Sequence, residues 1–279
     1  MKYVKMKKAF LFFLIISALC ILASCKTAES AAEVVEEEKP KSNLEALMAM
    51  NVGTRQAGDN SIRTTNWFES QAKKKAEENP AEENQGKVIF YGASNIDYWK
   101  TVSEDFPEYN ILNFAIAGTT IGEQFSYSQY VIYPYNPKVL VLSGSTNDYV
   151  AAGNDVADDV RLENAYNARV SMFEDYSERF PESVFVILGT LCVPARDNFT
   201  AISNKLNEMI KEYCDSHDRF FFVEDGDFVY NADGSFDMDL FEEDGIHFTS
   251  VARSQWAEYI RPVLAEAVDS LSDKGNVLK

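Results

Sequence analysis

The sequence predicts an α/β fold in which helices cover both faces of a five-stranded parallel sheet, a three-layer α/β/α sandwich. Five short runs are almost wholly apolar and rich in β-branched and aromatic side chains, at 87–91, 110–114, 139–142, 184–188 and 220–223. Continuous apolar runs are typical of strands that are buried on both faces of a parallel sheet. Longer segments with helical spacing separate these runs, and the alternation indicates right-handed βαβ crossovers.

Six segments have the spacing of helices, at 66–79, 96–106, 121–133, 158–180, 198–216 and 250–271. The first ends at Pro80, which cannot continue a helix without losing a backbone hydrogen bond. Thr249 and Ser250 stand at the start of the last one and are natural N-caps. Ligands of parallel α/β sheets bind beyond the carboxyl ends of the strands, so functional residues are expected in the loops there.

The N-terminus predicts a secreted lipoprotein. Four lysines come first, Lys2, Lys5, Lys7 and Lys8, and an apolar stretch then runs to Leu22-Ala23-Ser24-Cys25. A basic region, a short apolar core and small residues before the cleavage point describe a secretory signal peptide, here 1–24. The last four residues resemble a bacterial lipobox, which implies lipidation of Cys25; an ordinary signal peptide with an incidental cysteine is the alternative. The lipobox implies a bacterial cell-envelope protein outside the cytoplasm, anchored to a membrane by lipid.

Residues 25–42 are rich in Ala, Glu, Lys and Ser and have almost no aromatic side chains. Such a segment cannot bury enough apolar surface to offset its ordering, which predicts a flexible tether. The remainder, 43–279, is long enough for a single catalytic domain with its core at about 66–270. Cys192 and Cys214 belong to this part, and the sequence fits either one disulfide or two buried thiols.

The chain is strongly acidic, with a formal net charge of −18 that becomes −22 once the four lysines of the signal peptide are removed. Phosphate backbones are bound by basic surfaces, so this charge argues against nucleic acid as a partner. The sequence has two separated histidines and no His-rich cluster to hold zinc. We therefore expect neither a metal nor another cofactor.

Four short stretches carry candidate catalytic residues, at 91–95, 113–118, 144–148 and 244–247. The first three follow directly on predicted strands, and the fourth lies in a polar loop before the last helix. They offer the hydroxyl of Ser94, the N–H of Gly118, the amide of Asn147 and the pair formed by Asp244 and His247. This set suffices for acyl transfer through a serine nucleophile.

Ser94 and His247 are the expected nucleophile and base. Ser94 lies in a tight turn from strand to helix, near the positive end of the helix, although a serine there can also be a simple N-cap. His217 lies at a polar helix end and is expected to be solvated, which leaves His247 to accept the serine proton. Asp244 can reach the other ring nitrogen and fix the tautomer; a local loop contact is the alternative.

Gly118, Asn147 and the backbone N–H of Ser94 are the expected oxyanion donors. The alternatives are a helix-entry glycine at 118 and an ordinary turn residue at 147. Asp148 is expected to brace its loop rather than to act as the triad acid. Tyr149 and Arg196 are candidate substrate contacts at strand ends, although core packing suits the aromatic side chains there better, Tyr98, Trp99, Tyr149 and Phe199.

These stretches resemble the blocks of the GDSL/SGNH hydrolase superfamily, which supply Ser, Gly, Asn and His in that order. The resemblance covers about 66–268. The stretches 106–113 and 134–137 also resemble the lipase/acylhydrolase branch, which contains acetylhydrolase-like and carbohydrate esterase-like members. The resemblance implies a flavodoxin-like sheet and the site roles given above. Ala93 stands where the family usually has Asp, and Ser145 where it usually has Gly; neither change removes a reacting group.

The sequence thus predicts a serine esterase that forms an acyl-enzyme on Ser94. No long apolar segment is present to cover a fatty-acyl tunnel, which favours short acyl groups, such as acetyl esters of carbohydrates or small molecules. The alternatives are a lysophospholipase or thioesterase acting on lipid acyl esters, and a non-catalytic glycan-binding lipoprotein.

Overall fold

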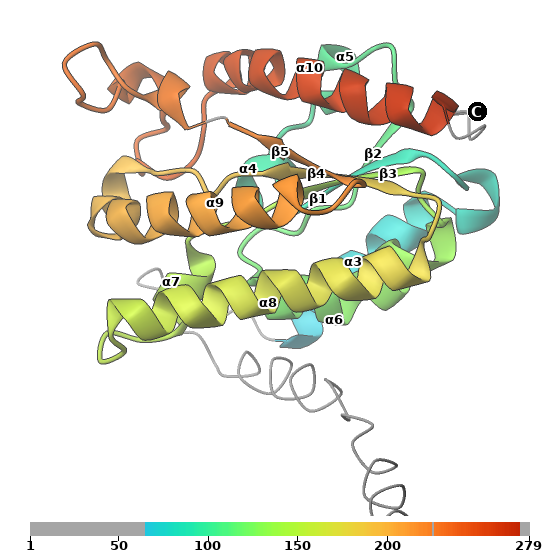
Figure 1. Ribbon diagram of the computed structural model, residues 1–279, viewed down its shortest axis with the longest axis horizontal. Helices are drawn as coiled ribbons and strands as arrows, with labels where there is room; N and C mark the ends of the chain where they lie inside the picture. Colours follow the sequence, from blue (N-terminus) through green and yellow to red (C-terminus); the bar gives the residue numbers. More distant parts are fainter. Residues whose placement is uncertain (1–64, 225, 274–279) are drawn as a thin grey trace, which may run out of the picture. The chain divides into compact units, whose positions relative to one another are not determined.

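Figure 1 shows the computed structural model of the chain, which describes residues 65–224 and 226–273. The predicted signal peptide (1–24), the predicted lipidation site Cys25 and the predicted tether (25–42) lie outside the described residues. Among the helices that are described, none is both long and apolar enough to cross a membrane.

Five parallel strands form one sheet, as predicted. They are β1 (Val88–Tyr91), β2 (Ile111–Asn113), β3 (Val139–Ser143), β4 (Val184–Leu188) and β5 (Phe220–Val223). Their order across the sheet is β2-β1-β3-β4-β5. From β1 the chain first adds β2 on one side, and it then adds β3, β4 and β5 in order on the other side. The order of the strands therefore reverses between β1 and β3. Such a switch point leaves a crevice at the carboxyl ends of the two strands, where doubly wound sheets bind their ligands.

Alternate residues of each strand point to opposite faces of the sheet. Both faces are buried, each in a core of its own. Val88 and Phe90 of β1 share a core with α10 (Ser250–Asp273), whereas Ile89 and Tyr91 belong to the core on the other face. The helices of that second core are α3 (Thr65–Glu78), α6 (Ile121–Val131), α8 (Asp158–Arg179) and α9 (Thr200–Asp215). Figure 1 shows α3, α6 and α8 across the sheet from α10. The predicted three-layer sandwich is confirmed.

The predicted helix over 96–106 is wrong in its extent, because the chain forms two short helices there. These are α4 (Ser94–Asp97) and α5 (Val102–Asp105). The side-chain amide of Asn113, at the end of β2, donates to the carbonyl oxygens of Ile96 at 2.6 Å and Trp99 at 3.3 Å. A continuous helix would use these carbonyls for its own hydrogen bonds, so this contact favours the break.

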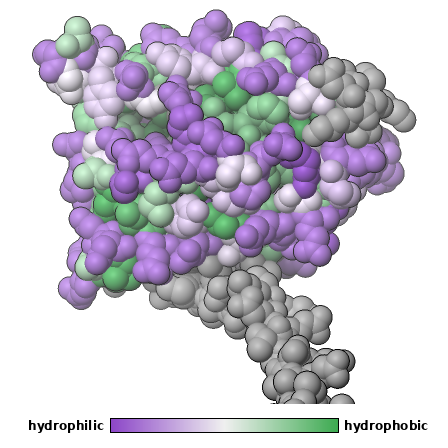
Figure 2. Space-filling model, viewed as in Figure 1, coloured by the Kyte–Doolittle hydropathy of each residue, from purple (hydrophilic) through white to green (hydrophobic). Residues whose placement is uncertain are grey.

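Further short helices connect the main elements. They are α7 (Asn147–Ala151) and the 3₁₀ turns Ala81–Glu83, Tyr133–Tyr135, Pro194–Phe199, Asp227–Val229 and Met238–Leu240. The start of α10 is capped as predicted, since Thr249 Oγ1 accepts a hydrogen bond from the backbone N–H of Ala252 at 3.3 Å. Hydrophilic residues cover most of the face seen in Figure 2, with hydrophobic residues visible between them.

Candidate active site

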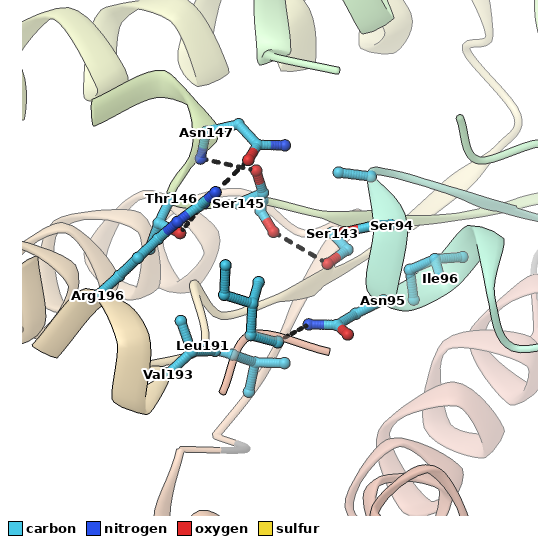
Figure 3. Close-up of a pocket in the computed structure, with 13 residues that line it drawn as sticks. Ser94, Asn95, Ile96, Ser143, Ser145, Thr146, Asn147, Leu191, Val193 and Arg196 are labelled. Atoms are coloured by element: carbon cyan, nitrogen blue, oxygen red, sulfur yellow. Dashed lines mark hydrogen bonds between the residues drawn. The ribbon is translucent and has the colours of Figure 1, made fainter. Parts of the chain in front are cut away.

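A pocket lies beyond the carboxyl ends of β1 and β3, at the switch point of the sheet (Figure 3). Residues 93–96 after β1 and 143–147 at the end of β3 line it, together with Leu191, Val193, Arg196 and Ile246. In the described part of the chain, Arg196 is the only charged residue that lines this pocket. The sheet topology alone therefore brings Ser94 and Asn147 to one cavity.

Ser94 is the first residue of α4 and is half-buried in the pocket. The N-cap of this helix is Ala93, whose backbone is extended at φ −103° and ψ −150°, and no side chain caps it. The alternative that Ser94 is a simple N-cap is therefore wrong. Because α4 has only four residues, its dipole is small, and the expected assistance from a long helix is absent.

The pair Asp244 and His247 forms as the spacing predicts. His247 Nδ1 lies 2.5 Å from Asp244 Oδ2, and Asp244 Oδ1 accepts from the backbone N–H groups of Ile246 at 2.9 Å and His247 at 3.0 Å. Gly245 turns the loop at a φ of +63°, a conformation that glycine adopts without strain. An ionised carboxylate only accepts hydrogen bonds, so Nδ1 carries a proton and Nε2 remains as the acceptor.

Two opposing effects act on the Asp244 carboxyl. Its burial favours the neutral form, but hydrogen bonds from the backbone N–H groups of His247 and Ile246 and from the imidazole outweigh burial, and the pKa of Asp244 lies below its usual value. The carboxylate is therefore ionised at neutral pH. A negative charge beside Nδ1 stabilises an imidazolium, which is the state of a histidine that has accepted a serine proton.

Asn95 joins the serine turn (92–97) to the histidine loop (244–248). Its side-chain Nδ2 donates to the carbonyl of Ile246 at 3.3 Å, and its Oδ1 accepts from the N–H of Phe248 at 3.0 Å. The ring of Tyr98 lies 4.9 Å from the ring of His247, centroid to centroid. Ser94 and His247 are therefore held on neighbouring segments at one rim of the sheet.

The amide of Asn147 lies between two loops that the sequence separates widely. Its Nδ2 donates to the carbonyl of Thr119 at 3.0 Å, and its Oδ1 accepts from Arg196 Nη1 at 2.9 Å. Since Arg196 can only donate, it orients Oδ1 toward itself and Nδ2 toward Thr119. A primary amide nitrogen has two hydrogens, and the bond to Thr119 uses one. Gly118 precedes Thr119 at a φ of +88°, which favours glycine.

Three side chains brace the loops around these donors. Ser145 Oγ accepts from the backbone N–H of Asn147 at 3.0 Å, so the residue that departs from the family pattern shapes this loop. Asp148 Oδ1 accepts from the N–H of Ile121 at 3.0 Å, in agreement with its predicted bracing role. Asp97 Oδ2 accepts from the N–H of Ala117 at 2.9 Å and supplies a carboxylate to the serine turn, where Ala93 cannot.

Of the other sequence predictions, the structure contradicts the one for Tyr149 and agrees with the one for His217. Tyr149 is 1% exposed, and its ring packs against Phe199 at 5.3 Å, so it belongs to the core and not to the pocket wall. His217 is exposed, as expected, with Nδ1 at 2.7 Å from the carbonyl of Tyr213. Cys192 and Cys214 are buried thiols that form no disulfide, which decides between the two alternatives.

Sequence reasoning missed Asn95 and Arg169. Arg169 in α8 is 2% exposed and donates to Thr190 Oγ1 at 2.6 Å. Its guanidinium packs against Gly144, so closely that a side chain there would overlap it. The signal for Arg169 is its place four residues after Ala165 and four before Phe173, on the buried face of the helix. No local pattern indicates the contacts of Asn95.

Within 65–224 and 226–273, no group of three or more His, Cys, Asp or Glu side chains converges to hold a metal ion. The chemistry that the described residues offer is that of a serine hydroxyl, an imidazole with a carboxylate partner, and amide donors.

Comparison with known proteins identifies the class. The GDSL-like lipase/acylhydrolase family matches residues 84–260. Among curated proteins, no match was found. Solved structures share the fold: a Streptococcus pneumoniae protein provisionally described as a platelet activating factor has a TM-score of 0.58 and 20% identity, over 71% of this chain and 95% of that one.

Two more solved structures are similar. A GDSL-like lipase from Bacteroides thetaiotaomicron has a TM-score of 0.56 and 19% identity, over 72% of this chain and 99% of that one. An acetyl-xylooligosaccharide esterase from Geobacillus has a TM-score of 0.50 and 13% identity, over 65% of this chain and 95% of that one. At these identities the likeness concerns the fold.

The fold and the family define an ester-hydrolysing enzyme of the α/β class. The chain belongs to the GDSL-like lipase/acylhydrolase family, within the GDSL/SGNH superfamily, as the sequence blocks predicted.

Proposed function

We propose that this enzyme is a serine esterase that removes short acyl groups, acetyl above all, from carbohydrates or small alcohols through an acyl-enzyme on Ser94. One observation supports it most. Ser94 and Asn147 line the same pocket, and Asn95 ties the loop of Asp244 and His247 to the turn of Ser94.

In the first half-reaction, Ser94 Oγ attacks the ester carbonyl carbon while His247 Nε2 accepts the hydroxyl proton. The carbonyl oxygen becomes an oxyanion, which the second hydrogen of Asn147 Nδ2 and the backbone N–H groups of Gly118 and Ser94 stabilise. The tetrahedral intermediate then collapses, the bond to the alcohol breaks, and the imidazolium of His247 gives its proton to the departing oxygen.

In the second half-reaction, water attacks the acyl-enzyme. His247 takes one proton from that water, the oxyanion forms again at the same donors, and the bond between the acyl carbon and Ser94 Oγ breaks. The serine oxygen recovers its proton from the imidazolium, and the carboxylic acid leaves. The carboxylate of Asp244 stabilises the imidazolium in both halves, because it lies against Nδ1.

The pocket wall supports a short acyl group. Ile96, Leu191 and Val193 line it and are 1%, 7% and 3% exposed, so they offer only a small apolar surface to an acyl group. Arg196 stands on the same wall and suits a polar alcohol such as a sugar. One structural neighbour is an esterase of acetylated xylooligosaccharides. That likeness is one of fold, so the pocket chemistry is the stronger support.

Ser94→Ala and His247→Ala test the mechanism directly. Both variants should lose hydrolysis of p-nitrophenyl acetate while they unfold at the same temperature as the wild type. A fluorophosphonate probe should label the wild type at Ser94 and fail to label Ser94→Ala. Undiminished turnover by a folded Ser94→Ala protein would refute the nucleophile assignment. A wild type that the probe never labels would instead favour a non-catalytic glycan-binding protein.

The acyl length is tested with p-nitrophenyl esters from two to twelve carbons. We expect kcat/KM to be highest for acetate and to decline with length. A maximum at eight carbons or longer would favour a lysophospholipase or thioesterase. Release of acetate from acetylated oligosaccharides then separates carbohydrate substrates from other small esters.

We also propose that the enzyme acts in the bacterial cell envelope, attached to a membrane through lipid on Cys25. The support is the lipobox-like sequence before that cysteine, Leu22-Ala23-Ser24. Metabolic labelling with a palmitate analogue should mark the full-length chain and not Cys25→Ala. Equal labelling of both chains, or none of either, would reject the anchor.

A further inference from the structure

Asn95 holds the histidine loop on both sides of His247. Its Oδ1 accepts from the backbone N–H of Phe248, one residue after the histidine, and its Nδ2 donates to the carbonyl of Ile246, one residue before it. Asn95, which follows Ser94 in the chain, thus binds the backbone on both sides of His247, the residue that accepts the proton of Ser94 in the proposed reaction.

We propose that Asn95 is a positioning residue that sets the place of His247 relative to Ser94. This inference rests on the proposed function, in which His247 accepts the proton of Ser94. Asn95 itself touches no reacting atom in that mechanism. Because Asn95 is adjacent to Ser94 in the chain, its hydrogen bonds to the histidine loop fix the position of the base relative to the nucleophile.

The proposed catalytic pair lies in the more exposed part of the histidine loop. The side chain of Asp244 is 46% exposed and that of His247 is 24% exposed, whereas the next residue, Phe248, is buried in the core. Backbone hydrogen bonds also restrain the loop. The carbonyl of Gly245 accepts from the N–H of Ala195 at 3.0 Å, and the carbonyl of His247 accepts from the N–H of Glu242 at 2.8 Å. Asn95 restrains the part of the loop that contains His247.

An asparagine suits this role because its amide offers one acceptor and donors on the same planar group. Leucine has the same branched shape and can make neither bond. Aspartate keeps an acceptor for the N–H of Phe248, but it loses the donor to Ile246 and places a negative charge against that carbonyl. Asn95→Leu therefore removes both hydrogen bonds to the histidine loop, and Asn95→Asp removes one of them.

Asn95→Leu and Asn95→Asp test the proposal, with Asn231→Leu as a matched control. Asn231 also restrains a loop through its side-chain amide, which donates to Ser235 Oγ and to the carbonyl of Phe236, but it does not line the pocket. For Asn95→Leu we expect kcat for p-nitrophenyl acetate to fall about tenfold to hundredfold with little change in KM, because small displacements of a catalytic group have effects of that size. Asn95→Asp should fall between this variant and the wild type, and Asn231→Leu should match the wild type.

Labelling with a fluorophosphonate separates positioning from unfolding. A positioning role slows the rate of labelling at Ser94 but leaves the final labelled fraction complete. A structural role alone lowers the labelled fraction and leaves the rate of the remaining folded molecules unchanged, which would overturn the proposal. If Asn95→Leu does not fold, Asn95→Asp decides by the same two readouts.

The outcomes also distinguish this inference from the proposed function. A wild type that labels and an Asn95→Leu protein that labels at the same rate reject the role of Asn95 and leave the esterase mechanism intact. A wild type that neither labels nor hydrolyses esters rejects the proposed function, and the positioning role with it.

Discussion

The carboxylate of Asp97 accepts a hydrogen bond from the backbone N–H of Ala117 at 2.9 Å. Asp97 ends the helix that Ser94 begins, and Ala117 directly precedes Gly118. The other oxygen of Asp97 is held by Lys75 of α3, with Nζ at 3.1 Å from Oδ1. The serine turn therefore contacts the loop of the proposed oxyanion donor through one residue and the histidine loop through another.

We predict that Asp97→Ala lowers kcat for p-nitrophenyl acetate about tenfold or more, because the loop before Gly118 loses its restraint and small displacements of a donor have such effects. Steady-state kinetics measures this. Asp97→Asn keeps an acceptor for the N–H of Ala117 and should recover most of the rate. Lys75→Met is the control, since it removes the ion pair and leaves the bond to Ala117. Wild-type kcat in Asp97→Ala would contradict the prediction.

Arg196→Met should lower kcat through Asn147. Arg196 donates to Asn147 Oδ1 at 2.9 Å and to Thr146 Oγ1 at 2.7 Å, and without these bonds only the bond to Thr119 orients the amide. Complete loss of one oxyanion donor costs about 2.7–4 kcal/mol, so a donor that is only misoriented should cost less than that. Arg196→Lys keeps a donor and should retain part of the rate. A rise in KM with unchanged kcat would make Arg196 a substrate contact instead.

The sheet could be predicted from the sequence because its signal is local. Each strand is largely apolar, with Asn113 and Ser143 as polar residues at the ends of β2 and β3, and burial on both faces favours that pattern wherever the strand lies. The break in the predicted helix over 96–106 could not be predicted in this way. It depends on Asn113, which contacts Ile96 and Trp99 from a different strand, and tertiary contacts of that kind override local helical spacing.

The candidate site shows the same division. The contact between Asp244 and His247 and the place of Ser94 and Asn147 at one pocket could be predicted, because loop spacing and strand order determine them. The catalytic roles of these residues stay predictions. Asn95 could not, since its two partners lie 151 and 153 positions away along the chain. Tyr149 shows the converse: its position after a strand suggested the pocket, but its ring fills the core.

The pKa of Asp244 predicts how stability depends on pH. The folded protein lowers this pKa, so the carboxylate stabilises the fold at every pH above the unfolded value of about 3.9, and this contribution disappears as the pH falls through the folded value. Asp244→Asn should therefore be less stable than its parent at pH 7, and the difference should shrink below pH ~4. Urea unfolding of both chains, with His247 kept in each, from pH 7 to pH 3 measures it. A difference that grows toward acid would have the wrong sign.

Gly144→Ala should destabilise the protein because the guanidinium of Arg169 occupies the space of the new methyl group. Arg169 is 2% exposed and holds Thr190 Oγ1 at 2.6 Å, so it cannot move aside without leaving a buried charge poorly bonded. Overpacking of this kind typically costs about 1–3 kcal/mol.

Urea denaturation of Gly144→Ala, Arg169→Met and the double variant measures the effect as a cycle. The shorter, neutral methionine gives the methyl group room, so the double variant should be more stable than the sum of the two single changes predicts. Additive effects would mean that the two residues do not compete for space. Since Gly144 lines the pocket, kcat should follow the same pattern: loss in Gly144→Ala, and partial recovery when Arg169 is shortened.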